Sequence, residues 1–346
     1  MSEPIRSDKK TLFGAAINPP VFFGSLIVLL SLIGTTIIIG EPVEELFRTV
    51  QANISDAAGW FFILLANLLM FFLIYLAFSK FGKIRLGGVN AKPDFSRISW
   101  FSMLFSAGLG IGLLFYGVAE PIYHFNDNPF VDNTDTIAAA KSAMGITFYH
   151  YGIQAWSIYA TVGLALAFFT FNLKLPLTIR SIFYPLLGDK IYGRWGDLID
   201  VISVIATVVG LATSLGLGAQ QVNAGIEYLF GIEYSREAQM IIIVIITALA
   251  TLSLLAGLDK GIRRLSEVNM GLAMVLLVFV LAIGPTAFLM DSFVQNLGYY
   301  IDNFFKIGLW TESFVGVKDD SNWQNVWTVF YYAWWIAWSP FVGIFI

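Results

Sequence analysis

The stretch YYAWWIAWSP, residues 331–340, places three tryptophans within five residues of a segment that is apolar enough to cross a bilayer. On a helix, Trp334 and Trp338 lie four residues apart and Trp335 and Trp338 three apart, so the three indoles point into one sector. A group of indole faces is suited to bind a quaternary ammonium ion. Tryptophans also anchor helices at the membrane interface or fill a core. The cluster alone leaves both interpretations open.

The composition indicates a membrane protein. Of the 346 residues, 57% are hydrophobic and 13% charged, and the mean hydropathy is +0.74, values outside the range of soluble domains. The absence of cysteine excludes disulfides and thiolate metal sites. The metalloprotease motif H-E-x-x-H and the phosphate loop G-x-x-x-x-G-K-[ST] are also missing. We therefore expect an all-α polytopic membrane protein that is not an enzyme and has no nucleic-acid partner.

Eight apolar segments are long enough to span a hydrocarbon core about 30 Å thick. They are residues 20–40, 57–79, 99–119, 138–171, 196–220, 238–257, 267–290 and 323–346. Residues 293–309 have the pattern of an amphipathic helix along the membrane surface. Most of the 20 Lys and Arg residues fall in the N-terminal segment and every second loop, which predicts a cytoplasmic N-terminus. Because the eighth span has no polar residues after it, we expect the chain to be part of a longer protein.

The third predicted span carries glycines at alternate positions, Gly108, Gly110 and Gly112. Each glycine costs a helix about 1 kcal/mol relative to alanine, so the cluster favours local unwinding. Where a span unwinds, its backbone groups become available to cations and to anionic parts of a substrate. The alternative is close helix packing, because Gly108 and Gly112 form a G-x-x-x-G pair.

Two neighbouring spans add further candidates. The fourth contains Tyr151, Trp156 and Tyr159, of which the last two share a helix face. The fifth contains hydroxyls at Thr207 and Thr213. Such hydroxyls are suited to ligate Na⁺, but they also bond back to their own helix carbonyls.

Ionisable side chains are few in the predicted spans. Glu120 and His124 lie at the outer end of the third span, His150 lies early in the fourth, and Asp197 and Asp200 lie near the start of the fifth. Charges inside a membrane commonly mark proton or ion pathways. These positions near the interfaces favour solvated side chains instead. We therefore expect no proton relay, and any coupling would use an ion such as Na⁺.

Three stretches are similar to one transporter family. They are GLGIGLLFYGVAEPIYHF at 108–125, GLDKGIRRLSEVNM at 257–270 and WTVFYYAWWIAWSPFVGIF at 327–345. From residue 18 to its end the chain resembles the betaine/choline/carnitine transporters. The resemblance implies a twelve-span homotrimer of the bacterial inner membrane with a LeuT-like fold, in which two inverted repeats of five helices follow two peripheral spans.

The same resemblance divides the chain into five parts. They are a cytoplasmic tail at 1–18, two peripheral helices and a loop at 19–98, the first repeat at 99–290, an outer loop with the surface helix at 291–322, and the start of the second repeat at 323–346. The second repeat would be only begun. Because alternating access needs both repeats, residues 1–346 alone are not expected to transport.

The resemblance also implies site residues. The substrate-binding set would be Trp334, Trp335, Trp338, Phe115, Tyr151, Trp156, Tyr159, Gly108, Gly110 and Gly112. One sodium ion would lie between Thr207 and the carbonyl of Phe341, although Leu211 occupies the position of a second family hydroxyl. Carbonyls of Ser106 and Leu109 would serve another sodium ion, and no other cofactor is implied.

The implied function is uptake of a quaternary-ammonium osmolyte such as glycine betaine, choline or carnitine, coupled to Na⁺ and serving osmoprotection. One alternative is a sodium-independent antiporter of the same family. Those exchangers carry an arginine in the fifth span, and residues 197–221 contain none here. Another alternative is a membrane sensor that binds the same ligand without transporting it.

Overall fold

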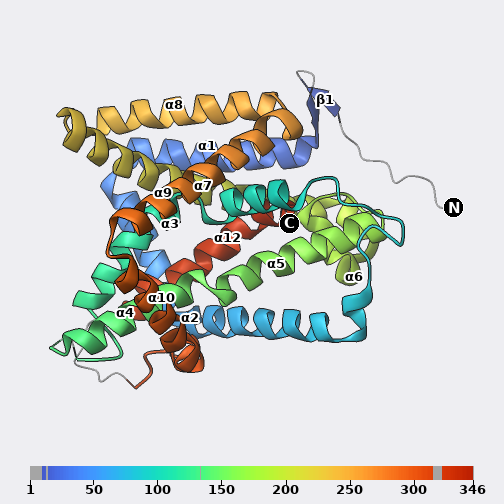
Figure 1. The fold of residues 1–346 in the computed structure, drawn as a ribbon. Coiled ribbons are helices and arrows are strands. Elements are labelled where there is room, and N and C mark those ends of the chain that lie inside the picture. Colours follow the sequence, from blue (N-terminus) through green and yellow to red (C-terminus); the bar gives the residue numbers. More distant parts are fainter. Residues whose placement is uncertain (1–9, 13–14, 133, 315–321, 346) are drawn as a thin grey trace.

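The structure is a computed structural model that describes residues 10–12, 15–132, 134–314 and 322–345. Its long helices form a bundle in which most of them run roughly along one direction (Figure 1). They are α1 (Pro19–Ile39), α2 (Glu41–Phe78), α3 (Arg97–Asn126), α4 (Thr136–Tyr151), α5 (Ile153–Ala167), α7 (Arg194–Phe230), α8 (Arg236–Leu255), α9 (Arg263–Ile283) and α12 (Phe330–Phe345). The prediction of an all-α polytopic membrane protein is confirmed.

Short elements connect these helices. They are η1 (Lys80–Lys83), η2 (Phe168–Asn172), η3 (Ile179–Phe183), α6 (Tyr184–Leu187), η4 (Gly188–Tyr192), η5 (Leu258–Ile262), α10 (Thr286–Asp302), α11 (Phe304–Gly308) and η6 (Asn325–Val329). A small antiparallel hairpin, β1 (Lys10–Leu12) and β2 (Ala15–Ile17), precedes α1. Most of the predicted N-terminal tail, and residues 315–321 of the predicted outer loop, lie outside the described residues.

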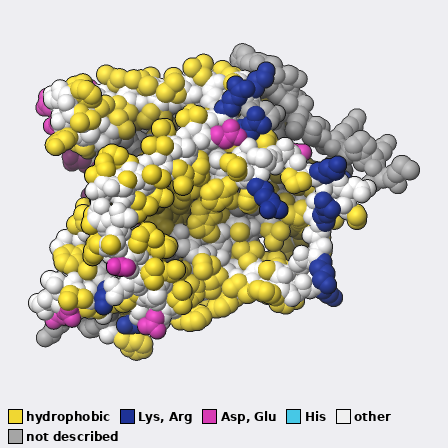
Figure 2. All heavy atoms as spheres, in the orientation of Figure 1, with side chains coloured by type: hydrophobic (Ala, Val, Ile, Leu, Met, Phe, Trp, Pro, Cys, Tyr) yellow, Lys and Arg dark blue, Asp and Glu magenta, His cyan; other side chains and the backbone are white. Residues whose placement is uncertain are grey.

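Six helices or helical stretches are long and apolar enough to cross a membrane, and the bent helix α3 makes a seventh. Helices α4, α5 and η2 form one of the six, at the place of the predicted fourth span. The predicted eighth span corresponds to η6 and α12, and the α-helical part has 16 residues. The surface between the ends of these helices is predominantly apolar, as a lipid-facing surface requires (Figure 2).

The seventh predicted span, residues 267–290, extends past the end of α9 into α10. Helix α9 ends at Ile283, and α10 begins at Thr286 rather than at residue 293. Gly284 and Pro285 separate the two helices, because proline cannot donate the backbone hydrogen bond that would continue α9. Helix α10 runs across the bundle rather than along it (Figure 1). It packs on α4, where Tyr300 is buried.

Helix α12 forms the centre of the bundle. It packs against α5, α7 and α3, and it lies between them in the ribbon view (Figure 1). Its aromatic side chains belong to the buried core, with Tyr331, Tyr332 and Trp335 each at most 3% exposed. The burial of these rings supplies much of the apolar contact between the helices.

Candidate functional site

The bend of α3 lies at the glycine segment. Gly110 has φ 49° and ψ −144°, a conformation that glycine adopts without strain, and the two halves of the helix meet at 51°. This confirms the expectation of a local break. Close packing holds as well, since a Cβ on Gly108 would lie 2.8 Å from Cη2 of Trp156. The helix break thus lies at Gly110, and the close helix packing lies at Gly108.

Aromatic side chains from other helices hydrogen-bond to the carbonyls around this bend. The Trp338 indole N–H donates to the Ala107 carbonyl over 2.7 Å. The Tyr159 hydroxyl donates to the Gly108 carbonyl over 3.3 Å, and the Tyr151 hydroxyl to that of Gly112 over 3.1 Å. The bend is therefore attached to α12, α5 and the end of α4 by candidate substrate-binding residues.

The three tryptophans of α12 face two sides. Trp334 and Trp335 stack, with ring centroids 5.5 Å apart and planes at 12°. Trp335 turns toward α4, where its N–H donates to the His150 carbonyl over 3.1 Å. Trp338 instead faces α3 and α7, and a Cβ on Gly210 would lie 3.1 Å from its ring. The three indoles thus lie on one helix, but they do not point into one common sector as predicted.

The remaining aromatic candidates are distributed around this group. Tyr151 contacts Trp335 edge-on, with ring centroids 5.7 Å apart, and Tyr159 contacts it at 5.9 Å. Trp156 contacts Tyr159. The ring contact of Phe115 within the described part of the chain is with Tyr116 rather than with a tryptophan.

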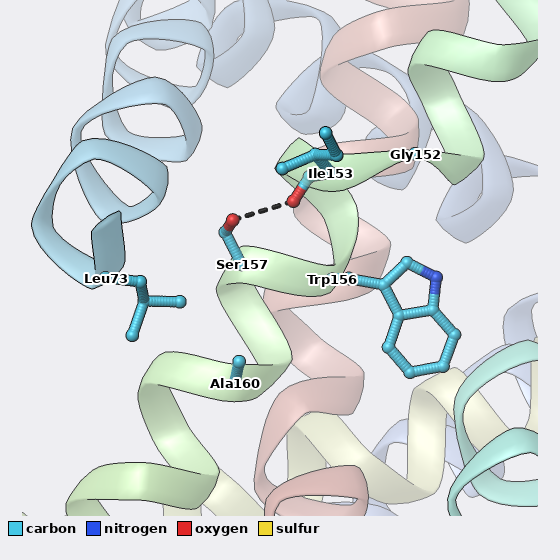
Figure 3. Close-up of a pocket in the computed structure, with 6 residues that line it drawn as sticks. All are labelled: Leu73, Gly152, Ile153, Trp156, Ser157 and Ala160. Atoms are coloured by element: carbon cyan, nitrogen blue, oxygen red, sulfur yellow. Dashed lines mark hydrogen bonds between the residues drawn. The ribbon is translucent and has the colours of Figure 1, made fainter. Parts of the chain in front are cut away.

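A pocket of about 460 Å³ opens beside Trp156. Its lining comes from Leu73 of α2 and from the start of α5, as Figure 3 shows. The Trp156 indole points away from Leu73, and the Ser157 hydroxyl is bonded back to the Ile153 carbonyl over 2.7 Å (Figure 3). The pocket is therefore apolar and lies between α2 and α5, outside the tryptophans of α12.

The predicted sodium ligands lie on helices that contact one another. Half-buried Thr207 is on α7 and half-buried Phe341 is on α12, two helices in direct contact. Phe341 also packs on Trp338, with ring centroids 4.9 Å apart. Ser106 and Leu109 precede the bend of α3, and the Ser106 hydroxyl accepts a hydrogen bond from the Asn269 amide of α9 over 3.0 Å.

Glu120, His124 and His150 are not solvated, so the expectation for these residues was wrong. All three side chains are 0% exposed. His124 Nε2 lies 3.0 Å and His150 Nδ1 lies 2.5 Å from Glu120 Oε1, while the Tyr331 hydroxyl donates to Oε2 over 2.6 Å. The rings of Trp323 and Trp327 pack on His124 and exclude water from it.

The same three side chains offer ligand atoms within 4.8 Å of one another, as a metal site would. Two ligand atoms of a tetrahedral zinc ion lie roughly 3.3 Å apart, given metal–ligand bonds of about 2.0–2.1 Å. The separation of 2.5 Å between His150 Nδ1 and Glu120 Oε1 is instead that of a short charge-assisted hydrogen bond. The arrangement is therefore a hydrogen-bonded cluster around a carboxylate.

A second charge cluster lies at the start of α7, where solvated side chains were expected; Arg180 and Asp200 are 7% and 11% exposed, and Asp197 is 23% exposed. Arg180 donates to Asp200 over 2.6 Å and to Asp197 over 2.9 Å. The Asn18 amide adds a contact to Asp197 over 3.3 Å. The solvation expectation fails because η3 and η4 fold over this end of α7. The cluster fastens the loop after α5 to α7 and to the start of α1.

Residues 20–346 match the family model described as BCCT, betaine/carnitine/choline family transporter. The chain belongs to this family. Similar proteins of the family include the glycine betaine transporter OpuD of Bacillus subtilis, 47% identical over 88% of this chain and 59% of OpuD. The high-affinity choline transport protein of Escherichia coli is 43% identical over 95% of this chain and 48% of its own length.

A glycine betaine transporter of Acinetobacter baylyi is 42% identical over 96% of this chain and 50% of its own length. The chain thus spans about half the length of these betaine/carnitine/choline family members. The relatives are named as transporters and not as enzymes.

Sequence reasoning missed the Glu120 cluster as a buried unit. The GVAEPIYHF part of a family-like stretch was the signal that could have drawn attention to it.

Proposed function

We propose that this protein takes up quaternary-ammonium compounds such as glycine betaine, choline or carnitine. The observation that carries the proposal is the meeting of the tryptophan-rich helix α12 with the glycine bend of α3, in a chain of this family. Indole faces attract an ammonium ion, at about 0.5–2 kcal/mol per ring. The backbone at the bend is suited to a substrate carboxylate or hydroxyl.

The hydrogen bonds at the bend suggest how binding and movement are coupled. The side chains of Trp338, Tyr159 and Tyr151 donate hydrogen bonds to carbonyls of α3. A substrate that displaces one of these side chains breaks its hydrogen bond and so releases part of α3. A ligand shifts a conformational equilibrium when it binds one state better than the other. We therefore propose alternating access in which substrate binding frees α3 from α12 and α5.

We further propose that Na⁺ drives uptake. The support is the contact between α7, which carries Thr207, and α12, which carries Phe341. Hydroxyl and carbonyl oxygens are ligands that a hard cation prefers. Ser106 and Leu109 lie next to the bend, where a second ion would respond to its opening.

The distribution of charge supports a membrane orientation. Lys and Arg side chains gather at the end of the bundle near η1 and α6, on the right in Figure 2. By the positive-inside rule this end is cytoplasmic. We propose that the protein lies in the bacterial inner membrane with its N-terminus in the cytoplasm, and that it assembles as a homotrimer.

The test is transport by the protein expressed from its complete gene and reconstituted in proteoliposomes. Labelled glycine betaine, choline and carnitine should each be assayed for counterflow and for uptake with and without an inward Na⁺ gradient. We expect counterflow of at least one compound and faster uptake with the gradient. Exchange that ignores sodium would favour the antiporter, and binding without counterflow would favour the sensor.

A further inference from the structure

Among the described residues, no lysine or arginine forms an ion pair with the buried carboxylate of Glu120. Within the described part of the chain its ion pairs are with His124 and His150 alone. It accepts hydrogen bonds on both oxygens, with the two imidazoles at Oε1 and the Tyr331 hydroxyl at Oε2. A carboxylate that accepts from several donors is favoured in its ionised, acceptor-only form.

The hydrogen-bond pattern of His124 favours a neutral imidazole. His124 donates through Nε2, and its buried Nδ1 has no hydrogen-bond partner among the described residues. A proton on that nitrogen would be a buried donor without an acceptor, which is costly. His150 contacts Glu120 through Nδ1, and its Nε2 lies 3.0 Å from the Thr328 hydroxyl, which is able to donate or to accept there. Within the described residues, the Glu120 carboxylate thus has no partner with a fixed positive charge.

Tyr331 joins this charge to the tryptophans. Its ring stacks on Trp335, with centroids 5.8 Å apart, and on Trp334 at 6.5 Å. Its hydroxyl lies 3.3 Å from that of Tyr151, which in turn donates to the Gly112 carbonyl at the bend. One continuous chain of contacts thus leads from the carboxylate to the candidate substrate site.

We propose that Glu120, from its place beside Tyr331, supplies the counter-charge for the substrate's ammonium group by long-range electrostatic attraction. The inference rests on the proposed function, because it assigns a charge to the site described there. Two unit charges about 10 Å apart at an effective dielectric constant of about 20 change a binding constant about tenfold. A zwitterion such as glycine betaine carries its own carboxylate, which offsets this attraction. A net cation such as choline feels it fully.

The experiment measures binding of choline and of glycine betaine to the detergent-purified protein from the complete gene, by isothermal titration calorimetry. Glu120→Gln removes the charge and keeps the shape of the side chain. It should weaken choline binding about tenfold or more and betaine binding about threefold or less. Equal weakening of both ligands would overturn the proposal and leave Glu120 a structural residue.

Two further variants separate charge from position. Tyr331→Phe removes the hydroxyl but not the charge, so it should weaken both ligands by the same factor. His124→Lys places a fixed positive charge beside Glu120 and should reproduce the selective loss of choline binding. If Glu120→Gln does not fold, His124→Lys decides the question. An unchanged ratio of choline affinity to betaine affinity in His124→Lys would overturn the proposal. A wild-type protein that binds neither compound would instead refute the proposed function itself.

Discussion

Trp338 connects α12 to the bend of α3 through two properties of one side chain. Its N–H donates to the Ala107 carbonyl, and its ring packs against Phe341 and the backbone at Gly210. Trp338→Ala removes both the donor and the π face, and we expect betaine binding to weaken at least about tenfold. Trp338→Phe keeps a π face, so a smaller loss is expected. Equal loss in the two variants, measured by calorimetry, would assign the effect to the hydrogen bond rather than to cation–π contact.

Gly108 is the glycine of α3 whose added Cβ would lie closest to another side chain. An added Cβ would lie 2.8 Å from the Trp156 ring, so Gly108→Ala should displace this ring and weaken ligand binding several-fold. Gly216→Ala on α7 is the matched control, because nothing lies within 4 Å of its added Cβ. Alanine favours a helix by about 0.5–1 kcal/mol, so the control should bind normally and unfold no earlier. Thermal unfolding and calorimetry of both variants test this, and normal binding by Gly108→Ala would contradict it.

The sequence predicted the tryptophans and the glycine break but not the burial of Glu120. Trp334 and Gly110 are recognisable because their residue types are unusual at those positions in a span. Glu120 lies near the end of α3, where a carboxylate is ordinarily solvated. Its burial depends on Trp323 and Trp327, which are about 200 residues further along the chain and cover the neighbouring His124. The residues around Glu120 therefore do not by themselves reveal its burial, although they lie in a family-like stretch.

At the scale of elements, apolarity alone located some helices closely and others only in part. The predicted span 20–40 matches α1, which begins with Pro19 and stops at Gly40. The predicted span 57–79 covers only the second half of α2, which starts at Glu41. The first turns of α2 are polar but still helical, with acidic residues at its N-terminus that complement the helix dipole. A hydropathy pattern reports the part of a helix in lipid, not its full length.

The packing of the loop after α5 depends on the ion pair between Arg180 and Asp200, whose side chains are 7% and 11% exposed. Asp200→Asn leaves a buried guanidinium short of its charge partner and should destabilise the protein by about 3 kcal/mol. Glu44→Gln is the control, because Glu44 pairs with Arg48 at an exposed site, 62% and 77% exposed. Exposed pairs contribute about 0–1 kcal/mol. Thermal unfolding in detergent should separate the two variants, and equal melting temperatures would show that the buried pair is dispensable.

For the whole molecule, the charge distribution and the helix directions together make a topological prediction. Lys83 follows α2, and Asp127 follows α3, so the two exposed residues flank the bent helix α3 at its opposite ends. The proposed orientation places Lys83 in the cytoplasm with the other basic residues and Asp127 outside. The 346 residues contain no cysteine, so a single introduced thiol reports its own position without background.

We therefore expect a membrane-impermeant maleimide to label Asp127→Cys in cells whose outer membrane is permeabilised and whose inner membrane is intact. Lys83→Cys should react only after the inner membrane is permeabilised. The cysteine-free parent chain measures the background labelling. Labelling of both variants after the inner membrane is permeabilised shows that each thiol is accessible.

The reverse labelling pattern would invert the orientation and place the basic end outside. It would leave the helix packing unchanged, because α12 contacts α3, α5 and α7 whichever end faces the cytoplasm. Only the direction from which a substrate first reaches the bend of α3 would change.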